Sequence, residues 1–252
     1  MRLPVWTLDS YQDKRQPADP LPADAVMPNE LVRSITFPVT IKTIILQNGY
    51  IRFRERAAGS AEAGVLNFDH LNVVVSPFTT DAKSKLYGVP TRFDLNGMFV
   101  GQSQLAIKAT YPLHDSAFNL QLEATVGSFS VNRLNTFLVP NERKELTESR
   151  VDTAFVTMNI AAGTSTTNLT PHYRGVSMKV LATSSKDSAG LIEGISTLAA
   201  NTFILRGDNP ADKMTPVVSA TTTRTRAKTE ELFQFIWLSL RAALGSIVGG
   251  FS

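Results

Sequence analysis

The chain has 252 residues, with 25 basic and 22 acidic side chains, no cysteine, and 43% hydrophobic residues. This length and composition suffice for one large β domain or two small ones, and they exclude a disordered chain. The lack of cysteine excludes disulfides, thiolate catalysis and cysteine-bound zinc. Basic and acidic residues are interspersed, without a basic stripe carrying aromatics, so nucleic acid is not an expected partner.

The sequence offers no conventional membrane helix. It contains no run of about 18 consecutive apolar residues, which a bilayer-spanning helix needs. The start, Met1-Arg-Leu-Pro-Val-Trp6, also lacks the apolar centre of a signal peptide. The protein is therefore expected to be cytoplasmic, or to be targeted by a segment upstream of this chain.

Residues 1–30 are polar and rich in proline, which predicts an extended lead-in, with a short helical turn near Asn29–Arg33. A hairpin is expected next. Residues 39–46 are apolar and β-branched, Gln47-Asn48-Gly49 has the composition of a tight turn, and 50–56 would return.

The next strand, 65–75, changes its apolar phase midway, which predicts a bulge near Asp69-His70. Three strands follow as an antiparallel meander over 91–101, 104–111 and 117–127. The last of them alternates strictly, with apolar residues at every second position from Phe118 to Val126. This period of two is typical of a strand with one buried and one solvated face.

The second half of the chain mixes short helices and strands. A short helix is expected over 131–139, ended by Pro140. Strands are expected at 151–160, 169–182 and 217–226, with a turn at 161–168 and a weak helical pattern at 190–200. A final helix follows Thr229, its plausible N-cap.

Together these elements predict a mainly β protein. The expected architecture is a long, curved antiparallel sheet forming a groove or half-open roll, with a short mid-chain helix and amphipathic helices at the C-terminus. The lead-in would cover 1–30, the sheet domain 31–183, and a helix-strand-helix segment, 184–252, would close the same domain.

No catalytic or metal-binding pattern is present, so an enzyme is not expected, and neither is a cofactor. The three histidines, His70, His114 and His172, lack metal-ligand spacing, and there is no nucleophile elbow or glycine-rich phosphate loop. Asp69 beside His70 could form an acid–base pair, but a structural role in a bulge is the favoured interpretation.

The final helix carries an apolar stripe with two interpretations. It could pack onto the end of the sheet, or lie on a membrane or partner surface. The stripe residues considered for that second role are Phe233, Ile236, Trp237, Leu240, Leu244 and Ile247.

Four segments carry a resemblance to a known family. They are 41–53 (IKTIILQNGYIRF), 64–75 (GVLNFDHLNVVV), 200–210 (ANTFILRGDNP) and 233–240 (FQFIWLSL). Across roughly residues 20–252 the chain resembles the C-terminal portion of an AsmA-like protein.

The resemblance implies a non-enzymatic protein of the bacterial envelope, in the periplasm, whose curved sheet binds or conducts phospholipid in outer-membrane homeostasis. Membrane association would come from a segment missing from this chain, and a membrane surface or envelope proteins would be further partners. The apolar residues expected to face lipid are Phe93, Leu95, Phe99, Leu105, Ile107, Phe118, Leu120, Leu122 and Val126.

A second hypothesis needs no lipid. The apolar side of the sheet could pack against a second sheet, giving a closed β-sandwich that docks a protein partner through its edge or its C-terminal helix. The two hypotheses differ in whether residues such as Phe118, Leu120 and Leu122 contact protein or line an open groove.

Overall fold

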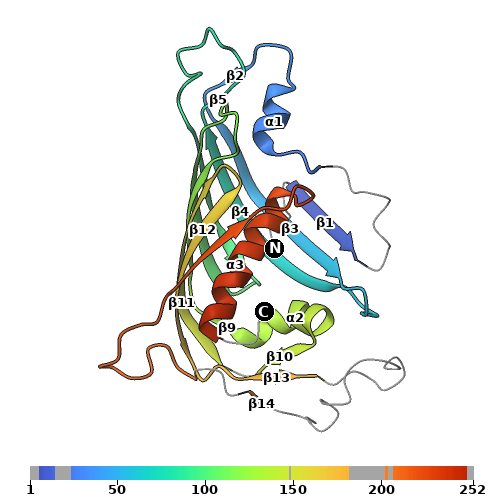
Figure 1. Cartoon of the computed structure of the whole chain (residues 1–252), viewed down its shortest axis with the longest axis vertical. Coiled ribbons are helices and arrows are strands. Elements are labelled where there is room, and N and C mark those ends of the chain that lie inside the picture. Colours follow the sequence, from blue (N-terminus) through green and yellow to red (C-terminus); the bar gives the residue numbers. More distant parts are fainter. Residues whose placement is uncertain (1–5, 15–23, 148, 182–201, 204–206, 249–252) are drawn as a thin grey trace.

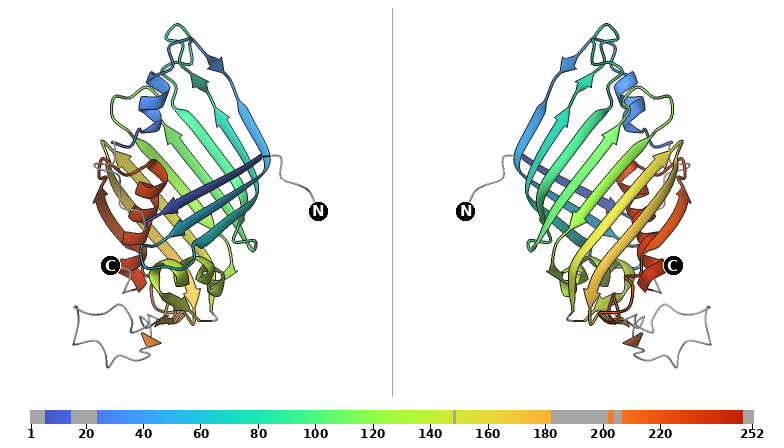
Figure 2. Two further views of the ribbon diagram at one scale, coloured as in Figure 1. Left: turned by 90° about the vertical axis from the view of Figure 1, so that its right-hand side faces the viewer. Right: turned by 90° about the vertical axis from the view of Figure 1, so that its left-hand side faces the viewer.

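A single large sheet dominates the computed structural model, which describes residues 6–14, 24–147, 149–181, 202–203 and 207–248. The sheet has 10 strands in the order β1-β3-β4-β6-β7-β8-β11-β12-β15, and β9 also pairs with β11. These strands are β1 (Trp6–Asp13), β3 (Ile44–Arg56), β4 (Gly64–Ser76), β6 (Thr91–Phe99), β7 (Ser103–Tyr111), β8 (Leu120–Val126), β9 (Phe129–Ser130), β11 (Arg150–Ala161), β12 (Thr164–Arg174) and β15 (Ala220–Thr225). The sheet rolls up on itself without closing (Figures 1 and 2).

The remaining elements lie at the ends and inside the roll. The helices are α1 (Pro28–Arg33), η1 (Val131–Leu134), α2 (Asn135–Glu142) and α3 (Leu232–Val248). Two small sheets join β2 (Thr40–Ile41) to β5 (Phe78–Thr79), and β10 (Lys144–Leu146) to β13 (Met178–Val180) and β14 (Thr202–Phe203). Figure 1 places α1, β2 and β5 at one end of the roll, and α2, β10 and β13 at the other.

The predicted fold class is confirmed: the chain is mainly β, with a curved sheet, a short mid-chain helix and a C-terminal helix. The meander is also present, because β6, β7 and β8 pair as antiparallel neighbours. A two-layer sandwich is not formed by the described residues, since the other two sheets have only three and two strands.

The proline-rich lead-in contains a strand that the sequence analysis missed. Trp6–Asp13 forms β1, which pairs with β3 in parallel and makes one edge of the large sheet. Parallel neighbours far apart in sequence leave no turn signal, so only the folded chain reveals this pairing. The helical turn expected at Asn29–Arg33 is present as α1.

The expected hairpin at Gln47-Asn48-Gly49 is wrong. The chain runs through these residues as one 13-residue strand, β3, whose register against β4 shifts between Leu46, Gly49 and Ile51. Asn48 does adopt the positive φ that its sequence favours, at 50°, but in a bulge instead of a turn. The bulge expected at Asp69-His70 is confirmed. It lies on β4, the strand that pairs with β3, where His70 has φ 51° and the register against β6 shifts between Asp69 and Asn72.

Two further boundaries differ from the prediction. β12 begins at Thr164 rather than at 169, because the chain reverses in a tight turn at Ala162 and Gly163, both with positive φ. Pro140 lies inside α2 and does not end it. The helix expected over 190–200 falls outside the described residues.

Three apolar clusters line the inside of the roll. The largest joins α2 and α3 to the sheet through residues such as Phe137, Val156 and Ala243. The second gathers Met27, Phe118, Leu120, Met158, Ile160 and Phe235 beneath the start of α3. The third lies on β4, β6 and β7 around Leu71, Val73, Leu95 and Leu105.

Candidate functional site

Two adjacent rows of side chains define the faces of the sheet, each crossing from β3 to β15. The outer row is largely polar and consists of Ile45, Val74, Asp94, Lys108, Glu123, Thr157, Asn168 and Thr221. The neighbouring inner row is entirely apolar and consists of Leu46, Val73, Leu95, Ile107, Ala124, Val156, Leu169 and Ala220. Register across the sheet thus gives the roll an apolar concave face and a convex face that is polar over most of its width.

The helices cover only part of this concave face. α3 packs against β12 and β15, and α2 packs against β3 and β4. Accordingly, inner-row residues on β11, β12 and β15 are buried, Leu169 being 2% exposed and Ala220 6%. The first residue of the row, Leu46, lies on β3 and is 40% exposed.

A second row of side chains on the concave face runs beside the first inner row. It lies two residues closer to the α1 end of each strand, and the helices cover it less. Its members on β3, β4, β6, β7 and β8 are all partly exposed, namely Ile44, Val75, Phe93, Ala109 and Leu122. The same row continues into Met158 and Thr167, which are 3% and 0% exposed. Exposure therefore changes along one row, from open on β3–β8 to buried on β11 and β12. We call these five partly exposed residues the open apolar row.

The nine residues expected to face lipid all lie in the clusters of the concave face, although in two separate ones. Four are buried against protein, namely Leu95, Leu105, Phe118 and Leu120. The other five are partly exposed, namely Phe93, Phe99, Ile107, Leu122 and Val126. Phe118 and Leu120 are buried in a cluster with Met27 and Phe235, and Leu122, of the open apolar row, packs against the same cluster but stays partly exposed.

The six stripe residues of the C-terminal helix divide unequally. Ile236, Trp237, Leu240, Leu244 and Ile247 are buried or partly buried in the clusters, and Trp237 meets the Phe137 ring edge-on at 5.7 Å. Phe233 alone of the six is exposed, at 68%. The helix therefore packs five of the six stripe residues onto the sheet and α2, and leaves Phe233 exposed.

The most buried face of α3 runs through Phe235, Ser239, Ala243 and Ile247, which are all 7% exposed or less. Of these four residues the predicted stripe included only Ile247. Ser239 Oγ lies 2.7 Å from Ser165 Oγ on β12, and it donates to the Phe235 carbonyl at 2.8 Å. The sequence did contain a signal for this face. These residues are spaced four apart, and two of them, Ser239 and Ala243, are small, which lets a helix approach a sheet closely.

Two ion pairs hold α3, one just before its start and one at its middle. Near its start the Glu230 carboxylate accepts hydrogen bonds from Arg224 of β15, one of them 2.7 Å long. These Arg224 hydrogen bonds lower the pKa of Glu230, outweighing the opposing effect of its burial. Further along, Arg241 Nη2 pairs with Glu142 Oε2 of α2 at 2.9 Å.

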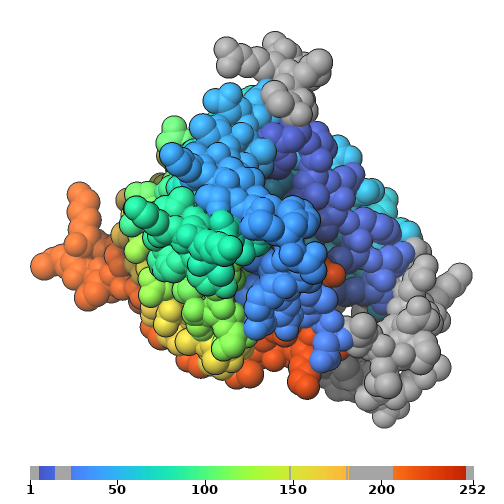
Figure 3. Space-filling model, turned by 90° about the horizontal axis from the view of Figure 1, so that it is seen from above, coloured from blue at the N-terminus to red at the C-terminus, as the bar shows by residue number. Residues whose placement is uncertain are grey.

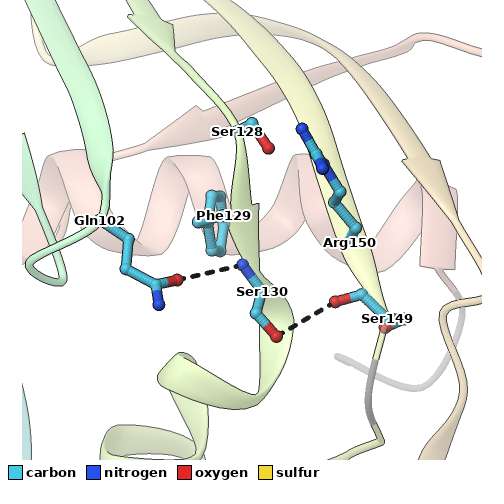
Figure 4. Close-up of a pocket in the computed structure, with 6 residues that line it drawn as sticks. All are labelled: Gln102, Ser128, Phe129, Ser130, Ser149 and Arg150. Carbon is cyan, nitrogen blue, oxygen red and sulfur yellow. Dashed lines mark hydrogen bonds between the residues drawn. The ribbon is translucent and has the colours of Figure 1, made fainter.

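A polar depression of about 490 Å³ lies beside β9 (Figure 4). Its lining consists of Gln102, Ser128, Phe129, Ser130, Ser149 and Arg150. The Ser130 backbone nitrogen lies 3.3 Å from the Gln102 side-chain amide, and the Ser130 hydroxyl donates to Asn132 Oδ1 at 2.8 Å and lies 3.5 Å from the Ser149 carbonyl oxygen. Arg150 is the one ionisable side chain among these six, and it pairs with Asp152 at 3.2 Å. The lining thus holds three serine hydroxyls, but none of its six residues is a histidine, aspartate, glutamate or lysine that could act as their general base.

The three histidines occupy unrelated places. His70 is exposed in the β4 bulge, His114 stacks on Tyr87 at 3.8 Å, and His172 meets Phe155 edge-on at 6.3 Å. Among the described residues no three histidine, aspartate or glutamate side chains gather as metal ligands. The conformation of His70 fits the bulge role expected for it.

Buried polar groups beneath α1 were not foreseen from the sequence. Asn29 is 2% exposed, and its amide donates to the carbonyls of Asp115 and Ser116 at 3.2 and 3.3 Å. Nearby, burial raises the pKa of the Tyr111 hydroxyl far above its usual range. These contacts fasten α1 to the loop between β7 and β8.

Within the part of the chain that the structure describes, every helix is too short or too polar to cross a membrane. Comparison with protein-family models, with curated proteins and with solved structures found no match to this chain.

Proposed function

We propose that this protein binds the acyl chains of phospholipid, or of another acyl lipid, on the concave face of its rolled sheet. One observation carries the proposal: the open apolar row lies on the concave side of central strands, yet its members stay partly exposed. Apolar side chains on the inside of a sheet are normally covered by protein, and a large uncovered apolar surface marks a binding site.

The dimensions suit an acyl chain. β6 and β7 each have nine residues, which at ~3.3 Å per residue extend for about 30 Å. One acyl layer of a bilayer is about half of its ~30 Å hydrocarbon core. An acyl chain lying along these strands would thus fit within their length, and each buried CH₂ would contribute about 0.8 kcal/mol.

The proposed role is binding or conduction without catalysis, and it needs no cofactor. Contacts between methylenes and aliphatic or aromatic side chains require no specific reactive residue. The resemblance to AsmA-like proteins leads us to place this role in the periplasm, in outer-membrane homeostasis. There the protein would be membrane-associated through a segment outside this chain, with envelope proteins as further partners.

The test compares two double variants with the same chemistry on opposite faces. Ile44 and Val75 form a cross-strand pair of the open apolar row, and both are partly exposed on the concave face. Ile45 and Val74 form a cross-strand pair on the convex face, 61% and 36% exposed. Threonine keeps the β-branch in each case, so Ile44→Thr with Val75→Thr makes the concave face more polar, Ile45→Thr with Val74→Thr does the same to the convex face, and both preserve strand propensity.

Native mass spectrometry and lipid extraction of the purified full chain give the readout. We expect lipid to co-purify with the unaltered protein and with the convex-face variant, and lipid content to fall severalfold in the concave-face variant. The urea midpoint of the concave-face variant, compared with that of the unaltered protein, shows whether the variant is still folded. Absence of lipid from the unaltered protein, or equal loss from both variants, would overturn the proposal.

A further inference from the structure

Exposed apolar side chains gather at the end of the roll formed by α1, β2, β5 and the loop after β5. We define the apolar tip as Leu31, Phe37, Ile41, Tyr87 and Val89, which are 56%, 64%, 38%, 36% and 44% exposed. Figure 3 looks onto this end and shows the segment around α1 and β2 lying beside the segment around β5. The tip is thus built from two stretches of chain far apart in sequence.

The backbone of this tip is held firmly, so the exposure of its apolar side chains is not a matter of a loose loop. Thr80 N–H donates to the Val39 carbonyl at 2.8 Å, and Thr80 Oγ1 donates to the Phe37 carbonyl at 2.9 Å. Thr79 Oγ1 donates to the Val39 carbonyl at 3.0 Å and lies 2.8 Å from Thr40 Oγ1. Because these hydrogen bonds already hold the backbone in place, binding through Phe37 would cost little additional backbone conformational entropy.

The charges around the tip favour an anionic partner. Segments 30–45 and 77–90 contain four cations, Arg33, Lys42, Lys83 and Lys85, all exposed. Against them stand two acids, Glu30 and Asp81, so cations outnumber acids in these segments, and of the cations Arg33 also donates to the carbonyls of Asn29 and Ser116. Glu30 Oε2 accepts the Met27 N–H at 2.7 Å, and Asp81 Oδ1 accepts the Lys83 N–H at 2.9 Å.

From this arrangement we infer that the apolar tip docks onto an anionic lipid surface. Aliphatic and aromatic side chains would enter the boundary between headgroups and acyl chains, while the surrounding cations meet lipid phosphates. This inference rests on the proposed function for its purpose, because Ile44 and Val75 of the open apolar row lie at the ends of β3 and β4 nearest the tip. Docking there would bring the concave face to a source of lipid.

Three exposed phenylalanines allow a matched test of which part of the protein contacts the membrane. Phe37 lies at the tip, Phe155 on the convex face and Phe233 on α3, and they are 64%, 47% and 68% exposed. Each is changed to serine in the full chain, and co-flotation is measured with phosphatidylcholine vesicles with and without phosphatidylglycerol. Phe37→Ser is expected to weaken vesicle binding roughly tenfold, and the other two changes are expected to leave it unaltered.

A second arm tests the charges. Lys83→Gln with Lys85→Gln should lower binding to vesicles containing phosphatidylglycerol and leave binding to pure phosphatidylcholine unchanged. Loss of binding on Phe233→Ser but not on Phe37→Ser would move the membrane contact to α3 and overturn the inference. Failure of the unaltered chain to bind any vesicle would also overturn it, leaving the tip to a protein partner.

Lipid content separates this inference from the proposed function. Phe37→Ser is expected to keep the co-purified lipid of the unaltered protein, because Phe37 is not part of the concave face. If the unaltered protein co-purifies with lipid but does not bind vesicles, only the docking of the apolar tip is refuted. If it binds vesicles through Phe37 but co-purifies with no lipid, only the concave-face proposal is refuted.

Discussion

Gly49 shows how one missing side chain decides where β1 lies. A Cβ at this position would come within 2.0 Å of Cε2 and Cζ2 of Trp6, whose ring fills the space beside the β3 bulge. The glycine was read in the sequence as half of a turn signal. Its importance in the folded chain is instead the close approach of another strand.

This contact predicts that Gly49→Ala displaces Trp6 and destabilises the protein by about 1–3 kcal/mol through overpacking. The urea midpoint gives the measurement, and Gly59→Ala is the control, because a Cβ there meets nothing within 4 Å. In a Trp6→Ala background the cost of Gly49→Ala should largely vanish. An undiminished cost in that background would show that the backbone, and not the indole ring, excludes a side chain.

Glu230 makes stability depend on pH. Its folded pKa is lowered by hydrogen bonds from Arg224, so the folded state holds the proton less tightly than the unfolded state does. The resulting stabilisation is fully present above the unfolded pKa, about 4.3. It is lost as the pH falls through the lower folded value.

We therefore expect Glu230→Gln to lower the urea midpoint at pH 7, and this difference from the unaltered protein to shrink as the pH falls below about 4.3. Glu231→Gln serves as the control at the neighbouring exposed position. A difference that stays constant from pH 7 to pH 3 would contradict the assignment of the effect to the Glu230 carboxylate.

At the scale of elements, α3 shows both the strength and the limit of periodicity. Its helical spacing was evident, and a helix is found at Leu232–Val248. A helix that is apolar nearly all round does not reveal which side packs most closely. The contact with β12 selects the side of Ser239 and Ala243, which are 1% and 0% exposed.

Close approach of α3 to the sheet predicts that Ser239→Leu destabilises the fold by about 1–3 kcal/mol. Ser246→Leu is a matched control, because Ser246 is exposed and also donates its hydroxyl to a carbonyl four residues earlier, at 3.2 Å. Urea unfolding of both variants provides the comparison. Equal effects would mean that loss of the serine hydroxyl matters more than the added volume.

The Asn48-Gly49 segment gives the complementary lesson about strands. A tendency to positive φ is local, and Asn48 shows it at 50°. Whether such a residue turns the chain or only bends it depends on what pairs with the flanking residues. Here β4 pairs with both halves of β3, so the two opposed bulges increase the local bend and twist of the sheet.

At the scale of the whole molecule, the roll has two distinct apolar surfaces. One is the open apolar row on the concave face, proposed to bind acyl chains, and the other is the apolar tip, inferred to dock on anionic lipid. The two lie near the same end of the roll (Figure 1). Separate variants therefore test the two roles: Ile44→Thr with Val75→Thr tests acyl-chain binding, and Phe37→Ser tests docking.

The sequence by itself determined that this is a one-sided sheet, because alternation with a period of two is a local property that survives in every strand from β6 to β8. The nine residues that it predicted to face lipid all lie in the apolar clusters of the concave face, and their contact with lipid stays a prediction. Tertiary structure alone decided which of them are covered. Leu120 is buried and Leu122 only partly buried because of where Met27, at the start of α1, and Phe235 of α3 pack, and these are contacts between residues far apart in the chain.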